Sequence, residues 1–133
     1  MPLHWTIDPR LKLFVVKADG FVDFAEVNRM LDEMMEAGVH GYRKMFDGTL
    51  GDTWMTPMEI LSLGVRMRSI HSTGPMGPLA VVIPDDKNHL VARILGILAA
   101  ARRPMRIFSD PEKAWQWLDS TAVRAHVPEP PVE

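Results

Sequence analysis

Hydrophobic and polar positions in the first part of the chain follow two patterns, one typical of strands and one of helices. Apolar runs at residues 5–7 and 11–18 predict two strands joined by a turn at residues 8–10. Strands joined by so short a turn pair antiparallel. Apolar residues then recur at helical spacing from a capping box at Asp23 and Glu26. The chain is therefore expected to begin with a hairpin and a helix, which Gly38 and Gly41 end.

Strands and helices alternate through the rest of the chain. The pattern predicts strands at residues 42–47, 79–83 and 105–108, and helices from Pro57 to about His71, from Asp85 or Asp86 to Arg102 and Arg103, and from Asp110 onward. Such alternation is typical of parallel sheets with helical crossovers. The predicted fold is α/β, in the order β-β-α-β-α-β-α-β-α, with a mostly parallel five-stranded sheet and an antiparallel first strand.

The strands also differ in how their apolar residues are spaced. The runs at residues 13–16 and 79–83 do not alternate with polar residues, which predicts that both faces of the sheet are covered there. The strand at residues 105–108 does alternate, because Arg106 separates Met105 from Ile107, and this favours an edge position or a half-exposed face. We expect residues 1–122 to form one domain and the Pro-rich residues 123–133 to form a flexible tail.

Composition narrows the classes of function. The chain has 133 residues, no cysteine and a formal charge of −2, which excludes disulfides and thiolate chemistry and provides no basic face for nucleic acid. The longest apolar run, residues 94–101, is too short to span a bilayer, and no signal-peptide pattern is present. We therefore expect a cytoplasmic protein without a membrane span.

The segment from Tyr42 to Glu59 is the most informative part of the sequence. A strand ending at Asp47 is followed by a polar loop and then by the capping box of Thr56 and Glu59, with Pro57 at the first helical position. The carboxyl end of a strand beside a helix N-terminus is where α/β proteins place ligands and where anions find free N–H groups. The candidate ligand- or partner-binding residues are Asp47, Thr49, Asp52, Thr53, Trp54, Met55 and Thr56.

Each candidate has two interpretations. Asp47 and Asp52 form either a carboxylate pair for acid–base or metal chemistry, or ordinary strand-end and loop residues. Thr49, Thr53 and Thr56 are candidates for phosphorylation or phosphate binding, whereas Thr56 also has a sufficient role as a helix cap. Trp54 and Met55 form either an exposed apolar pair at a ligand mouth or interface, or a pair that a folded-back loop buries.

No catalytic constellation accompanies these residues. The five histidines make no metal-binding pair, and no Gly-x-Ser-x-Gly, Gly-x-Gly-x-x-Gly or Gly-Lys-Thr sequence occurs. Two acids at Asp85 and Asp86 suit a helix start better than a hard-ion site, which needs more oxygen ligands. The sequence therefore predicts no enzyme, no cofactor and no metal centre.

Several landmarks resemble a known family. They are Trp5-Thr-Ile-Asp-Pro9, Leu13-Phe-Val-Val16, Met45-Phe-Asp47, Ala80-Val-Val-Ile-Pro84 and the segment 107–118. Together with the element order, they make residues 4–119 resemble the STAS domains of anti-sigma-factor antagonists and, more closely, the small stand-alone bacterial SpoIIAA-like proteins. The same fold class includes the CRAL-TRIO lipid-binding domains. Antagonists carry a phosphorylatable Ser or Thr beside a Gly at this helix start, and none of the three threonines here is followed by Gly.

The resemblance and the residues lead to two hypotheses. The first is a regulatory, non-enzymatic STAS-like domain that binds a protein partner or itself, with a homodimer as one form, through residues 47–57. The second is a carrier or sensor of a small apolar or anionic ligand, analogous to CRAL-TRIO domains, with Trp54 and the Met-rich second helix lining its pocket.

Overall fold

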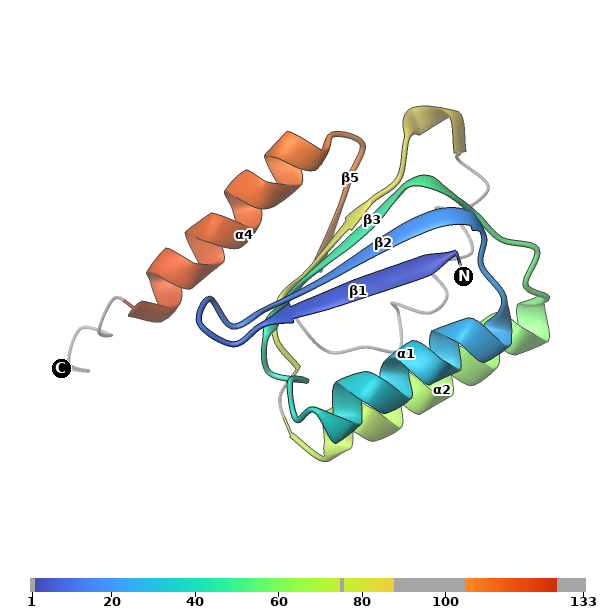
Figure 1. Ribbon diagram of the computed structural model, residues 1–133, viewed down its shortest axis with the longest axis horizontal. Helices are drawn as coiled ribbons and strands as arrows, with labels where there is room; N and C mark the ends of the chain where they lie inside the picture. The colour runs from blue at the N-terminus through green and yellow to red at the C-terminus, as the bar shows by residue number, and fades with distance from the viewer. Residues whose placement is uncertain (1, 75, 88–104, 127–133) are drawn as a thin grey trace, which may run out of the picture.

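A five-stranded sheet in the order β1-β2-β3-β4-β5 forms the centre of the computed structural model, which describes residues 2–74, 76–87 and 105–126 (Figure 1). The strands are β1 (Leu3–Asp8), β2 (Leu13–Phe21), β3 (Arg43–Asp52), β4 (Leu79–Val82) and β5 (Met105–Phe108). The described helices are α1 (Phe24–Glu36), α2 (Pro57–Ser72), the short 3-10 helix η1 (Asp85–Lys87) and α4 (Pro111–His126). β1 pairs antiparallel with β2 and the other neighbours are parallel, which confirms the predicted fold class.

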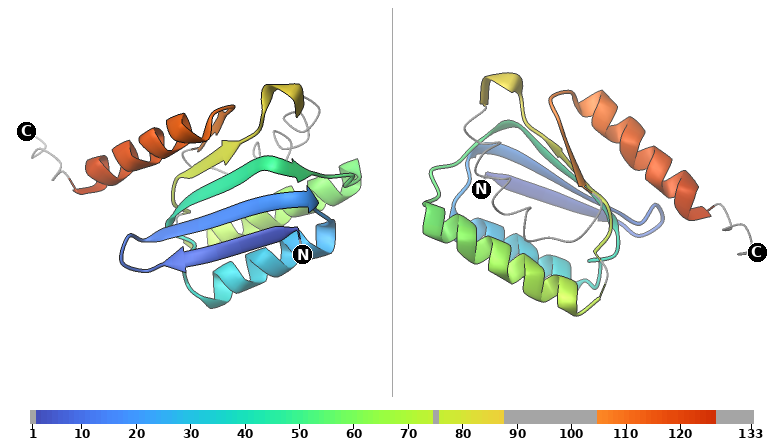
Figure 2. Two further views of the ribbon diagram at one scale, coloured as in Figure 1. Left: turned by 45° about the horizontal axis from the view of Figure 1, so that its top comes forward. Right: turned by 180° about the vertical axis from the view of Figure 1, so that it is seen from behind.

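The sheet has helices on both faces, as the lack of alternation in β4 predicts. α1 and α2 lie side by side on one face, and α4 lies on the other (Figures 1 and 2). Phe14 and Val16 of β2 belong to the core cluster of the first face, whereas Ala80 and Val82 of β4 pack against α4 on the second. All four residues of β4 are buried, and β5 is a half-buried edge strand. Both observations confirm the spacing argument.

α1 begins and ends where the sequence indicates. The Asp23 carboxylate accepts a hydrogen bond from the Glu26 N–H at 2.8 Å, which makes Asp23 the N-cap. Gly38 has a φ of +69°, and the N–H groups of Gly38 and Val39 bond to the carbonyls of Met35 and Met34. This is the Schellman arrangement, in which glycine tolerates the left-handed conformation that ends the helix.

The Asp23–Glu26 capping box is only half formed, contrary to the prediction. The Glu26 carboxylate does not return to its own N-cap but accepts a hydrogen bond from the Leu3 N–H at 3.0 Å. Glu26 is only 5% exposed, and Leu3 is 3% exposed. A buried N–H needs an acceptor, so the edge strand β1 uses the glutamate that the helix end would otherwise use.

The second and third strands are both shifted from their predicted bounds. The Asp8 carboxylate accepts from the N–H groups of Arg10 and Leu11, so the turn includes Leu11 and Lys12, and β2 begins at Leu13. β2 then continues beyond Ala18 to Phe21 and pairs with β3 as far as Asp52. The prediction of a strand that ends at Asp47 was therefore wrong, and the connection to α2 shrinks to residues 53–56.

Glycines account for this longer strand. A Cβ on Gly51 would lie 2.5 Å from the Ala18 Cβ, and a Cβ on Gly48 would lie 2.8 Å from the Val82 carbonyl oxygen. These residues permit a close approach between neighbouring strands, which is one of the roles that glycine has inside sheets. The register also shifts here, because the two steps from Lys17 to Asp19 face the three steps from Asp47 to Leu50. β3 therefore contains a bulge of one extra residue.

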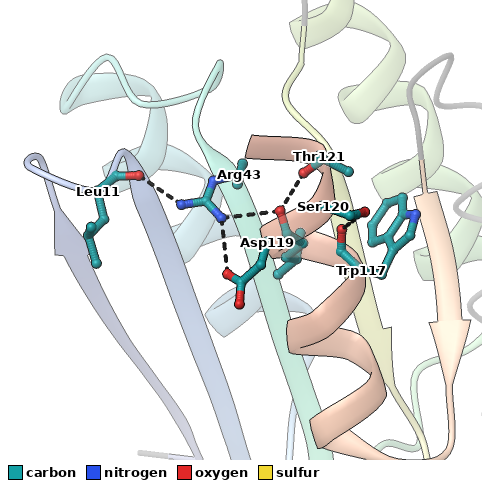
Figure 3. Close-up of polar contacts among 7 residues, drawn as sticks. Leu11, Arg43, Trp117, Asp119, Ser120 and Thr121 are labelled. Carbon is teal, nitrogen blue, oxygen red and sulfur yellow. Dashed lines mark hydrogen bonds and ion pairs between the residues drawn. The ribbon is translucent and has the colours of Figure 1, made fainter. Parts of the chain in front are cut away.

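Arg43, at the start of β3, joins the β1–β2 turn to α4 (Figure 3). Its guanidinium donates to the Leu11 carbonyl at 3.0 Å and to the Leu118 carbonyl at 3.2 Å, and it lies 3.7 Å from the Asp119 carboxylate. A single planar fork with several donors can serve the β1–β2 turn and α4 together.

Two predictions fall partly outside the described residues. The third helix and its end at Arg102 and Arg103 lie there, apart from η1 at its predicted start, and so do residues 127–133 of the predicted tail. α4 runs to His126 and so includes the first four residues that the sequence assigned to the tail. In the part of the chain that the structure describes, no helix has the length and apolar character that a membrane crossing requires.

Candidate functional site

The candidate residues lie along the last part of β3 and the short connection to α2, at the carboxyl end of the parallel strands. Asp47 accepts hydrogen bonds from the N–H of Thr49 at 3.0 Å and from its hydroxyl at 2.5 Å. Asp52 accepts from the N–H of Thr53 at 2.7 Å. Each carboxylate thus accepts a hydrogen bond from a neighbouring threonine. Within residues 2–74, 76–87 and 105–126, no three acidic or histidine side chains gather as metal ligands do.

Thr53 and Met55 turn inward. The Thr53 hydroxyl donates to the Val22 carbonyl at 2.7 Å and accepts from the Met55 N–H at 3.2 Å, and its residue is 8% exposed. Met55 and Ile60 both belong to the core cluster between the sheet and helices α1 and α2. They flank the N-cap of α2 at the positions of a hydrophobic staple, which fixes the direction in which the chain enters the helix.

Thr56 and Glu59 form the complete capping box that the sequence predicts. The Thr56 hydroxyl accepts from the Glu59 N–H at 3.2 Å, and the Glu59 carboxylate accepts from the Thr56 N–H at 2.9 Å. Pro57 has no N–H, and the Glu59 N–H already bonds to Thr56. Among the first three helical residues, this leaves the Met58 N–H to donate to an anion. The negative charge of the Glu59 carboxylate also disfavours binding of an anion at this helix start.

The three threonines therefore differ as phosphorylation candidates. Thr49 and Thr56 are exposed, but each hydroxyl lies beside a carboxylate or takes part in the capping box. Thr53 is buried, and its hydroxyl bonds to the backbone. Phosphorylation of any of the three stays a prediction.

Trp54 is the most exposed large apolar residue near this site, and its partner is not the predicted one. The residue is 79% exposed, whereas Met55 is only 9% exposed, so the pair expected from the sequence is divided between surface and core. Trp54 contacts Phe21 instead, with ring centroids 4.5 Å apart and a tilt of 51°. Phe21 itself is 55% exposed. The two aromatic rings thus form a pair on the surface, where β2 and β3 end.

Phe21 was missed by the sequence analysis, although the sequence carries a signal for it. Lys17 and Asp19 are alternate exposed residues of β2, and Phe21 is the next residue in the same phase. An aromatic residue in the polar phase of a strand indicates a surface function. The predicted strand ended before Phe21, so the position of Phe21 in the exposed phase of β2 was not recognised.

The outer side of α2 also carries exposed apolar residues. Met58, Leu61 and Val65 are between 58% and 70% exposed and recur at helical spacing, while Ile60, Leu63 and Ile70 are buried on the inner side. A helix that is apolar on both sides is typical of one that is covered on both sides. Trp54 lies in the connection to α2, two residues before the N-cap Thr56, so the aromatic pair stands near the N-terminal end of this helix. We call Phe21, Trp54, Met58, Leu61 and Val65 the apolar face.

A cavity of about 160 Å³ lies between the sheet and helices α1 and α2. Its lining is mainly apolar and includes six methionines, namely Met30, Met34, Met45, Met55, Met67 and Met76. Lys44 and Asp52 are the charged residues that line it among those the structure describes. Trp54 and Met58 do not belong to the lining, so the expectation that Trp54 lines a pocket does not agree with this geometry.

Comparisons with known proteins support the fold and assign no function to the candidate site. No family model matches the chain, and no curated protein is similar to it in sequence. A solved structure is similar: an uncharacterised protein of the DUF3478 family with a SpoIIAA-like fold, from Shewanella loihica PV-4. The two structures share 15% identity with a TM-score of 0.57, over 87% of this chain and 91% of the other. The chain thus has a SpoIIAA-like fold, as the resemblance of its sequence indicates.

Proposed function

We propose that this chain is a non-enzymatic binding domain with a regulatory role, which associates with a protein partner or with a second copy of itself through the apolar face. The observation that carries the proposal is the row of five large apolar side chains, each more than half exposed, from the end of β2 to the middle of α2. The largest exposed apolar patch of a monomer measures roughly 300–600 Å² and is often functional.

The chemistry of the apolar face supports an interface with protein. Aromatic residues and methionine are enriched at protein interfaces, and lysine and glutamate are depleted there. The contact between Phe21 and Trp54 restrains both rings before any partner arrives, which lowers the entropy lost on binding. Met58 adds an unbranched side chain that adapts to irregular surfaces.

The test replaces Trp54 with alanine and follows association by sedimentation velocity and light scattering over a concentration series. We expect Trp54→Ala to weaken association and to leave the far-UV circular dichroism spectrum unchanged, because the ring is on the surface. Leu11→Ala is the matched control, since Leu11 is 53% exposed in the β1–β2 turn, away from the apolar face. If both variants associate as the wild type does, with themselves and with any protein captured by the wild type, the proposal fails.

The cavity favours a second candidate function, a carrier or sensor of a small apolar ligand. An apolar cavity of about 150 Å³ in an engineered protein takes up benzene, so the volume here suits a ligand of that size or the end of a longer apolar chain. Methionine-rich linings adapt to ligands of different shapes.

Native mass spectrometry of protein freshly purified from cells tests the carrier hypothesis. A bound ligand would add its mass to the chain, and a ligand at 100 times its dissociation constant would stabilise the fold by roughly 2.7 kcal/mol. Trp54→Ala would leave that binding unchanged, since Trp54 does not line the cavity. A spectrum without added mass, together with no stabilisation by a panel of short-chain fatty acids and aromatic hydrocarbons, would exclude this function.

A further inference from the structure

We infer that the apolar face is covered by a second copy of this chain, with the two α2 helices antiparallel about a two-fold axis at Leu61. The inference rests on the proposed function and deepens it by naming the partner. Two-fold dimers are the commonest oligomers, and in them one surface patch must be complementary to itself. The arrangement of residues along the apolar face meets that requirement.

The exposed row along α2 is close to symmetric about its centre. Met58 lies three positions before Leu61, and Val65 lies four positions after it. An antiparallel two-fold axis at Leu61 therefore places Leu61 against its own copy and Met58 near the partner's Val65. These spacings of three and four residues also let two helices pack with a shallow crossing angle.

The two ends of the row are chemically complementary. Trp54 presents an exposed aromatic ring in the connection just before α2, and the exposed Arg68 lies towards the other end of the row, seven positions after Leu61. An antiparallel pair brings Arg68 of one copy towards Trp54 of the other, at both ends of the interface, where a guanidinium can stack on the indole. A parallel pair would instead bring the two Arg68 cations together, which opposes association.

The area of the apolar face is comparable to what a dimer interface requires. A standard interface buries roughly 800 Å² on each partner, of which about 57% is non-polar, so each copy must supply roughly 450 Å² of apolar surface. From their exposed fractions, the five side chains of the apolar face supply roughly 300–600 Å². The apolar face is thus of the order of size that one side of a dimer interface requires.

Sedimentation velocity of the full chain over a micromolar concentration series tests this inference. We expect the wild type to form dimers and Leu61→Glu to be monomeric, because the variant brings two carboxylates together on the axis. Leu11→Glu is the matched control and should form dimers like the wild type, since its exposed leucine lies in the β1–β2 turn. Circular dichroism should show all three proteins to be folded.

A double-mutant cycle then tests the geometry. Trp54→Ala and Arg68→Ala should each weaken the dimer by roughly tenfold, since each removes two cation–π contacts. The double variant should be little weaker than either single variant, because both substitutions remove the same contacts. Independent effects that multiply in the double variant would overturn the antiparallel arrangement.

The outcomes separate this inference from the proposed function. A dimer that survives Leu61→Glu would show that another surface is used, and this would overturn the inference. A wild type that stays monomeric would also overturn it, while the proposed function would stand if a different protein bound the wild type and lost affinity on Trp54→Ala. A monomeric wild type whose Trp54→Ala variant behaves identically in every binding measurement would contradict both the inference and the proposed function.

Discussion

The helices α1 and α2 begin with the same sequence pattern, an N-cap residue followed three positions later by glutamate, yet the two glutamates have different partners. Glu59 is partly exposed and returns to the N–H of its own N-cap, Thr56. Glu26 is buried and accepts from Leu3, which lies 23 positions away on the edge strand β1. The pattern therefore specifies where a helix starts, while tertiary packing decides which N–H the glutamate binds.

The largest expected effect is at Glu26. Glu26→Ala leaves the buried Leu3 N–H without its acceptor, and we expect it to lower the free energy of unfolding by about 2–3 kcal/mol. Glu26→Gln keeps an oxygen acceptor and should cost about 1 kcal/mol or less. Urea denaturation measures both. Equal losses for the two variants would mean that the carboxylate charge matters more than this hydrogen bond.

The two N-cap residues should have similar and smaller effects. Asp23→Ala and Thr56→Ala each remove one side-chain acceptor from a helix N–H, at 2.8 Å and 3.2 Å respectively, and each should cost about 1 kcal/mol. Thermal unfolding of the two variants side by side measures the difference. A much larger loss at one cap would show that its side chain does more than end a helix.

The smallest effect is expected at Glu59. Glu59→Ala removes a local and partly exposed hydrogen bond and a favourable charge at the helix start, and we expect a loss of about 0.5 kcal/mol. Combining it with Thr56→Ala should give less than the sum of the two losses, because the two side chains form one box. Glu26→Ala and Asp23→Ala should instead add, since Glu26 bonds to a different element. If the losses were additive in both pairs of substitutions, the two capping boxes would not differ in the way that their hydrogen bonds indicate.

Local patterns predicted the order of elements well because each element has a local cause. The caps at Asp23 and Thr56 and the glycine at position 38 act within a few residues, so the sequence displays them directly. The continuous apolar run of β4 likewise reports burial on both faces. The error in the length of β3 came from Gly48 and Gly51, which resemble loop residues until a neighbouring strand is placed against them.

The candidate site was harder to predict because exposure is a property of the whole fold. Trp54 and Met55 are adjacent and both apolar, and nothing local states that the first is on the surface while the second is in the core. The staple between Met55 and Ile60 decides this, since burying one residue of an extended pair turns the other outward. The partnership of Phe21 with Trp54 depends on the pairing of β2 with β3, which no short window of sequence contains.

The bulge in β3 has a consequence for insertions and deletions. Because successive strand residues point to opposite faces, the extra residue between Asp47 and Leu50 reverses the phase of everything that follows in the strand. Loss of one residue at this point would regularise the ladder and leave Leu50 opposite Asp19, so Thr53 and Trp54 would keep their directions. The same loss one or two residues later has no extra residue to absorb it. A codon-length deletion there would exchange the surface and core residues at the start of α2.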